Sequence, residues 1–374
     1  MPSPAPREKA ITFEALLLVV LVARLSAHFA LPQPLQGEAL TNFTLARALA
    51  TGTWPLGDAG PQIVHAVGYP LLLAPFFAAL GAGASVAFGV NLGLAMVSAL
   101  LVRGVARQIG LREAGQKLAL LGYALWLPGI WDCTLLVREN LGTPLMLLTA
   151  WLALRLLREG PRMGLALGAG LVWGAGLLTG SSMLSLIVAP LLALLLVEGG
   201  QLWRTPMASA VLATGALTML GAWHWMSTGL HGMPEPTALA MLAVGAGRAL
   251  PLPLPETPPL GETLGHLALF WWPHMPDGDE HALSRAMTYM RIGEVAQYVA
   301  LVTLGFAGLV GARNRARQRL IIGALIMAFW LLGGSRLLGD TYRDPVMPLL
   351  IVLSAAVLCE ATSRQARPAL AKAP

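Results

Sequence analysis

Acidic and basic side chains stand together at a few points of this 374-residue chain, each time beside a long apolar run. Glu38 follows the first such run, and Arg138 with Glu139 directly precedes another. A carboxylate can accept the proton of a hydroxyl group, and a guanidinium can bind a phosphate through paired hydrogen bonds. Glu38 and Glu139 are therefore predicted to be catalytic, and Arg138 is predicted to bind an anionic group of the substrate.

A second group of candidates, Arg336, Tyr342 and Arg343, lies in the short turn between the last two apolar runs. The planar guanidinium matches the geometry of a phosphate, and the tyrosine hydroxyl would add another donor. Asp340 and Asp344 stand close enough to neutralise both arginines, so a local ion-pair cluster is the competing interpretation. We interpret the three residues as a site for the phosphate of a lipid.

The first group of candidates also has a purely structural interpretation. An acidic residue in the first turn of a helix interacts favourably with the helix dipole, which would account for Glu38. Arg138 and Glu139 would then form an ion pair at the membrane interface. Asp132 is an alternative to Glu139 as the second carboxylate, so the sequence leaves the choice between them open.

No cofactor is assigned with certainty. Cys133 and Cys359 stand far apart, and the seven histidines match no metal-ligand spacing. A divalent metal ion therefore stays open as a cofactor, and His65 is only a weak candidate for its ligand.

The composition places these residues in a membrane protein. The chain is 56% hydrophobic and only 12% charged, with a mean hydropathy of +0.66, which excludes a soluble domain of this length. The net charge of +6 comes from short basic clusters between apolar runs, which argues against a nucleic-acid partner. We predict an all-α, polytopic integral membrane protein whose residues 1–374 form a single transmembrane domain.

Apolar runs of about 17 to 25 residues recur along the chain, each long enough to cross a hydrocarbon core of roughly 30 Å as a helix. A further run, 63–81, is interrupted by Pro70 and Pro75 and is predicted to dip into the membrane without crossing it. About ten transmembrane helices are predicted, over residues 11–31, 85–102, 116–130, 141–157, 163–179, 182–197, 206–227, 293–312, 319–335 and 345–362.

The charges predict which face of the membrane holds the candidates. If 63–81 dips, most Lys and Arg fall on the side of the N-terminus, as the positive-inside rule requires of the cytoplasm. Most acidic residues and the histidines fall on the other side, in or near the long loops 32–84 and 228–292. This topology has both termini in the cytoplasm and the site at the periplasmic face of a bacterial inner membrane. Charge counting hardly excludes a version in which 63–81 crosses and the N-terminus lies outside.

The stretch GEALTNFTLARALATGTWPLG (37–57), followed by VGYPLLLAPFFAALGAGA (67–84), resembles the start of a GT-C glycosyltransferase. The nearest branch holds the protein O-mannosyltransferases and the transferase that adds aminoarabinose to lipid A. Its members have an external acidic residue and juxtamembrane helices after the first membrane helix. Later segments, Leu127-Pro128, Arg138-Glu139 and Tyr342-Arg343-Asp344-Pro345, are similar to those of the family in order and spacing.

The resemblance implies that a sugar moves from a polyprenyl-phosphate carrier to an acceptor on the periplasmic side, by an inverting displacement at the anomeric carbon. It places Glu38 at the family's carboxylate and Arg343 where the family has Arg or Tyr. The implied partners are the lipid-linked sugar donor, an unknown acceptor and the lipid bilayer. Where the family often has an Asp-Glu pair, this chain has Gly37-Glu38.

Three other functions remain open on the sequence. A transporter or flippase would place charges at helix centres, where only Arg24 is found. A non-catalytic relative would explain the missing carboxylate. A polymer ligase of the O-antigen type would use arginines and a histidine of the loop 228–292, which contains Arg248, Arg285, Arg291, His231, His266, His274 and His281.

Overall fold

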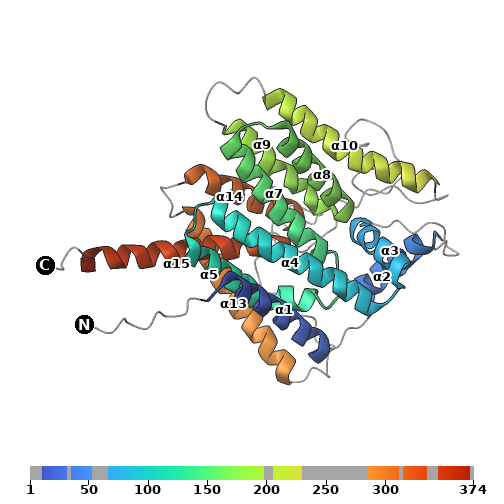
Figure 1. The fold of residues 1–374 in the computed structure, drawn as a ribbon, viewed down its shortest axis with the longest axis horizontal. Coiled ribbons are helices and arrows are strands. Elements are labelled where there is room, and N and C mark those ends of the chain that lie inside the picture. Colours follow the sequence, from blue (N-terminus) through green and yellow to red (C-terminus); the bar gives the residue numbers. More distant parts are fainter. Residues whose placement is uncertain are drawn as a thin grey trace, which may run out of the picture.

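The chain is all-helical wherever the computed structural model describes it, which confirms the predicted fold class (Figure 1). The described residues are 11–31, 35–52, 66–197, 205–229, 285–310, 315–334 and 344–370. Side chains are described for most of them, but not for 181, 223–229, 285–291, 333–334, 344 or 363–370. The predicted loop 228–292 therefore lies almost entirely outside the described residues.

Each of the ten predicted membrane runs coincides with helical structure. Among the described residues, five helices are long and apolar enough to cross a membrane, namely α1, α4, α7, α10 and α13. The ten runs correspond to α1 (Phe13–Ala30), α4 (Ala84–Gln108), α5 (Glu113–Ala124), α7 (Glu139–Glu159), α8 (Met163–Thr179), η1 (Ser181–Ile187) with α9 (Val188–Leu195), α10 (Thr205–Gly229), α13 (Arg285–Val310), α14 (Ala316–Gly334) and η3 (Asp344–Val346) with α15 (Met347–Leu370).

The prediction of one continuous helix over 116–130 is wrong. Helix α5 ends at Ala124, and a separate short helix, α6 (Leu127–Asp132), begins three residues later. Pro128 stands in the first turn of α6, where its missing N–H costs nothing, whereas inside a longer helix it would break the hydrogen-bond ladder. The break directs the chain across the end of the bundle toward the start of α7.

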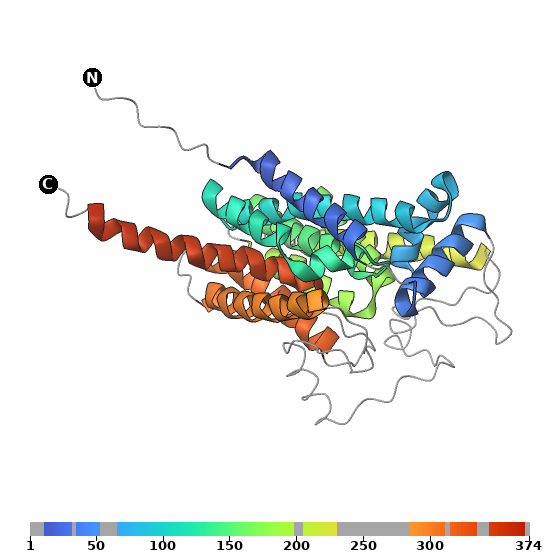
Figure 2. The same ribbon diagram turned by 90° about the horizontal axis from the view of Figure 1, so that it is seen from below.

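Two further helices, α2 (Gly37–Thr51) and α3 (Gly68–Leu80), follow α1 in the sequence and precede α4, and they pack against each other. Figure 2 shows them at the end of the bundle opposite to the C-terminal end of α15. The 13 residues of α3 span about 20 Å, less than the hydrocarbon core, which fits the prediction that this segment dips. Helix α2 is amphipathic, because it buries Ala39, Leu45 and Ala46 and exposes Thr41 and Thr44.

The Gly-Tyr-Pro sequence at 68–70 docks α3 onto the bundle. A Cβ atom on Gly68 would lie 2.5 Å from the Thr179 hydroxyl at the end of α8, so that only glycine permits this approach. Tyr69 is fully buried, and its hydroxyl donates to Asn91 Oδ1 of α4 over 2.7 Å. Pro70 lies in the first turn, where a helix tolerates it.

Helix α7 lies near the centre of the bundle, in contact with α4, α8, α9 and α14 (Figure 1). Next to it, α8 and α10 approach closely through glycines: a Cβ on Gly170 would overlap the Leu212 carbonyl, and one on Gly215 would lie 2.8 Å from the Leu167 carbonyl. Small residues allow such backbone contact, which is a common basis of helix association in membranes. The packed centre holds the first turn of α7 in place.

Candidate active site

Three asparagine side chains, Asn42, Asn91 and Asn140, hold the segment 133–138 that joins α6 to α7. They come from α2, α4 and α7, and each donates to carbonyl groups at or next to this segment. The bonds run from Asn42 Nδ2 to Leu136 O (2.8 Å), from Asn91 Nδ2 to Cys133 O (3.2 Å) and Leu135 O (2.8 Å), and from Asn140 Nδ2 to Asp132 O (2.8 Å) and Leu135 O (3.0 Å).

The segment 133–138, held by these hydrogen bonds, places Arg138 in contact with Glu38. The Arg138 main-chain N–H donates to Glu38 Oε1 over 3.2 Å, and its Nε lies 3.5 Å from the same oxygen. Asn42 Nδ2 also donates to this oxygen, over 3.4 Å. The Glu38 side chain stays 40% exposed, whereas that of Arg138 is 16% exposed. Two predicted site residues 100 positions apart therefore form one ion pair, with its carboxylate open to ligands.

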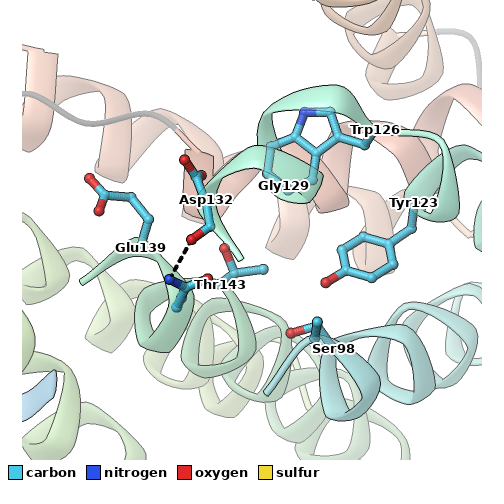
Figure 3. A pocket seen from close by; sticks show the side chains of 9 residues that line it. Ser98, Tyr123, Trp126, Gly129, Asp132, Glu139 and Thr143 are labelled. Carbon is cyan, nitrogen blue, oxygen red and sulfur yellow. Dashed lines mark hydrogen bonds between the residues drawn. The ribbon is translucent and has the colours of Figure 1, made fainter. Parts of the chain in front are cut away.

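Asp132 and Glu139 line a common narrow pocket beside this ion pair, with a volume of about 20 Å³, which is enough for about one water molecule (Figure 3). In the close-up the two carboxylates lie toward one end of the pocket, and Tyr123 and Ser98 lie at the other. Trp126 and Asn140 add an aromatic face and an amide. The structure thus places both alternatives for the second carboxylate in one pocket.

The chemistry open to this arrangement is hydroxyl recognition and proton transfer. The carboxylates of Glu38, Asp132 and Glu139 come from three elements that meet at the first turn of α7. Carboxylates accept hydrogen bonds from hydroxyl groups and can serve as general bases. In the described part of the chain no three or more His, Cys, Asp or Glu residues cluster as a metal site. A bound metal ion stays a prediction.

An apolar groove runs between α3 and α4, with about 1140 Å³ of empty space including the part open to the surroundings. Leu72, Phe76 and Leu80 of α3 form one wall, and α4 forms the other. On α4, Gly89 and Gly93 leave the groove open, since a Cβ on either would meet no atom within 4 Å. The same two helices are joined by the bond between Tyr69 and Asn91, and Asn91 also holds the segment 133–138 of the site.

The remaining predicted site residues, Arg336, Tyr342, Arg343 and His65, lie outside the described residues. The structure does place Pro345, at the end of the second group of candidates: a Cβ on Gly142 would lie 3.0 Å from Pro345 Cγ. The short helix η3, which contains Pro345, therefore contacts α7 about one turn after Glu139.

The sequence analysis missed the three asparagines. A signal was present, because Asn91 is a strongly polar residue inside the predicted membrane run 85–102, and such residues need hydrogen-bond partners in an apolar environment. The partner carbonyls could not be named, since they lie more than 40 positions away and come close only through the break between α5 and α6.

No family model and no curated protein matches the sequence. The fold is similar to that of ArnT from Cupriavidus metallidurans bound to undecaprenyl phosphate, with a TM-score of 0.60 at 13% identity, covering 93% of this chain and 60% of that one. For ArnT in the apo state the TM-score is 0.57 at 14% identity, covering 92% and 58%. The oligosaccharyltransferase of Archaeoglobus fulgidus matches with a TM-score of 0.53 at 12% identity, covering 95% and 51%.

These similarities confirm the expected GT-C resemblance at the level of the fold. They also support an integral membrane protein, in agreement with the apolar helices. The chain spans about 60% of the length of the ArnT chain that it matches.

Replacing Asn91 by leucine tests the support of the segment 133–138. The substitution leaves the Cys133 carbonyl and the Tyr69 hydroxyl without their partner and removes one of the two donors of the Leu135 carbonyl, which should lower the free energy of unfolding by about 1–3 kcal/mol for the lost bonds. Thermal unfolding of the purified protein in detergent measures the change. Thr214→Val, which removes an exposed bond within α10, is the control and should leave the transition nearly unchanged. Equal stability of Asn91→Leu and wild type would contradict this role.

Proposed function

We propose that the protein is an inverting glycosyltransferase that moves a sugar from a polyprenyl phosphate to an acceptor at the periplasmic face of the bacterial inner membrane. The observation that carries this proposal is the meeting of Glu38, Asp132 and Glu139 around the first turn of α7, beside Arg138, within a GT-C fold. The solved ArnT structure contains undecaprenyl phosphate, which supports a carrier of this class.

In the proposed reaction the acceptor hydroxyl oxygen attacks the anomeric carbon from the face opposite to the phosphate. A new carbon–oxygen bond forms while the bond from the anomeric carbon to the phosphate oxygen breaks. The electron pair of that bond stays on the phosphate, which departs as polyprenyl phosphate. Glu38 takes the proton of the hydroxyl, because it is the most exposed of the three carboxylates and is oriented by Arg138 and Asn42.

The remaining residues have supporting roles in this proposal. Asp132 and Glu139 would accept hydrogen bonds from sugar hydroxyls in the pocket, and Glu139 is the second catalytic candidate because it follows Arg138 directly. Arg336, Tyr342 and Arg343 would bind the departing phosphate from the segment that packs on α7 through Pro345. A divalent metal ion with His65 as a ligand is not needed for any of these steps.

The fold and the position of the charges favour this function over the alternatives. Charged side chains of the described site gather at the ends of helices, where a transferase acts at an interface, rather than at helix centres as in a transporter. The residues that a polymer ligase would need lie in the loop 228–292. A ligase that works through that loop would not require the pairing of Glu38 with Arg138, which the proposed transferase uses to orient its base.

Substitution of Glu38 by glutamine tests the assignment of the base. Membranes containing the protein are given radiolabelled undecaprenyl-phosphate sugars, and label that leaves the carrier is counted. The Glu38→Gln variant should lose a factor of about 100 or more in kcat with little change in KM, because glutamine keeps the shape but takes no proton. The matched control is Glu113→Gln, at an exposed carboxylate that pairs with Lys117 far from the pocket.

Full transfer by Glu38→Gln would overturn the base assignment. If Glu139→Gln or Asp132→Asn alone abolished transfer, the base would be the pocket carboxylate rather than Glu38. Transfer that depends only on Arg285 or His281 would favour the ligase function.

The side of the membrane that holds the site is tested by cysteine labelling. In a background with Cys133 and Cys359 replaced by alanine, Thr44→Cys stands on the exposed face of α2, and Glu113→Cys stands at the start of α5. A membrane-impermeant maleimide should label Thr44→Cys in intact spheroplasts and Glu113→Cys only after permeabilisation. The reverse pattern would place the candidate site in the cytoplasm.

The groove between α3 and α4 is proposed to hold the isoprenoid tail of the donor. A Cβ on Gly93 would meet no atom within 4 Å, so that the side chain of Gly93→Leu can enter the groove and take the place of part of the tail. The expected effect is a rise of about tenfold in KM for an undecaprenyl-phosphate sugar, equivalent to roughly 1.4 kcal/mol of lost burial, with kcat preserved. A donor with a short geranyl tail, which does not reach the groove, should be affected much less.

Gly221→Leu is the matched control, because Gly221 on α10 is equally open but lies outside the groove. Equal KM values for Gly93→Leu and Gly221→Leu would show that the groove does not contribute to binding of the donor. A rise in KM that is the same for long and short donors would also exclude it.

A further inference from the structure

Arg24 is fully buried inside the first membrane helix. It lies at the end of the second third of α1, on the stripe Leu16, Val20, Arg24 and Ala27 that faces the bundle, and none of its surface is exposed. Arginine within a membrane helix is costly and normally faces a partner or a polar cavity. The position of Arg24 on the buried stripe therefore calls for a compensating group inside the bundle.

The bonds that Arg24 makes do not use its guanidinium fully. Nη1 donates to the Val20 carbonyl over 3.3 Å, and the guanidinium carbon lies 4.8 Å from the centre of the Tyr123 ring. Nε and Nη2 are buried and have no hydrogen-bond partner among the described residues. A cation in this state is stabilised mainly by the electric field of its surroundings, so that nearby carboxylates become important.

The carboxylate pocket lies directly behind the Tyr123 side chain. Helix α1 packs against α4, α5 and α6, which carry Ser98, Tyr123 and Asp132, and all three of these residues line the pocket. Figure 3 shows the Tyr123 hydroxyl pointing toward Ser98 at the end of the pocket away from Glu139. The Cys133 thiol, which directly follows α6, lies within electrostatic reach of both Arg24 and Asp132.

We propose that Arg24 is a positioning residue whose buried charge keeps the Asp132 and Glu139 carboxylates ionised. Two carboxylates in one half-buried pocket disfavour each other's ionised form, and one of them would tend to take up a proton. A fixed positive charge behind the pocket wall opposes this tendency. It acts through the packed interior around Tyr123, where a charge acts more strongly than it does in water.

The other charged or titratable groups around Arg24 are few. Among the described residues of the packed elements they are Tyr123 on α5, Asp132 and Cys133 at the end of α6, and His28 one turn further along α1, where its ring stacks on Phe88. Arg103 of α4 lies at the opposite end of α1, against Phe13. Arg138 pairs with Glu38 at the exposed side of the site. Among these groups, Arg24 is therefore the buried cation that packs on Tyr123, which lines the pocket.

The consequence for catalysis rests on the proposed function, but the charge itself can be tested without any transfer reaction. Dicyclohexylcarbodiimide enters membranes and modifies carboxyl groups in their protonated form, and mass spectrometry of peptides locates the modified residue. The protein in native membranes is treated at neutral pH, and the modified fraction at Asp132 and Glu139 is measured.

The wild type should resist modification at neutral pH and become modified only as the pH falls. Arg24→Met and Arg24→Gln should raise the modified fraction at one of the two carboxylates about tenfold, which corresponds to one unit in protonation equilibrium. Arg24→Lys, which keeps the charge, should restore resistance. Arg47→Met, which removes an exposed arginine of α2 at the same end of the protein, is the matched control and should leave the pattern unchanged.

Modification of wild-type Asp132 or Glu139 at neutral pH would overturn the inference without the use of any variant. Equal modification of Arg24→Gln and wild type would overturn it as well. Loss of sugar transfer in Arg24→Gln with unchanged modification would leave the proposed function intact and refute the role of the charge. Increased modification in a protein that transfers no sugar would support the role of the charge and refute the proposed function.

Discussion

The hydrogen bonds from Asn42, Asn91 and Asn140 to the segment 133–138 are the constraint on which the site depends. Main-chain carbonyls that are buried outside a helix have no water to accept from, so the protein must supply donors. Amide side chains meet this need without adding charge. Because the three donors come from α2, α4 and α7, satisfying the carbonyls also fixes these helices relative to one another.

Positions of the chemically active groups follow from this constraint. Arg138 ends the held segment and Glu139 begins α7, so their places are set by the same bonds that satisfy the main chain. Asn42 reaches both the segment and Glu38, which aligns α2 with its carboxylate toward Arg138. The bond between Tyr69 and Asn91 also joins α3 to α4 and thereby sets the spacing of the two helices that line the apolar groove.

The sequence predicted the helices well because the length and apolarity of each run are local properties. The prediction failed where a proline or a change of helix type interrupts an apolar run. Pro128 divides 116–130, and 181–187 is a 3₁₀ helix rather than the start of an α-helix. Apolarity alone does not distinguish a broken helix from a continuous one. Glu38 and Arg138 could be assigned to one face from topology, but their contact depends on the path of the chain through the α5–α6 break.

The distribution of charge explains how a polar site can exist at the edge of a membrane. Glu38 and Arg138 are paired at the exposed rim, where water lowers the cost of each charge. Asp132 and Glu139 are less exposed and share one pocket, where two like charges raise the cost of ionisation, and the buried cation Arg24 lies against Tyr123 at the other end of that pocket. Replacing Arg24 by a neutral residue would therefore raise the free energy needed to ionise Asp132 and Glu139, whereas the pair of Glu38 with Arg138 would hardly change. The ionisation of the pocket carboxylates and that of the exposed ion pair thus depend on different residues.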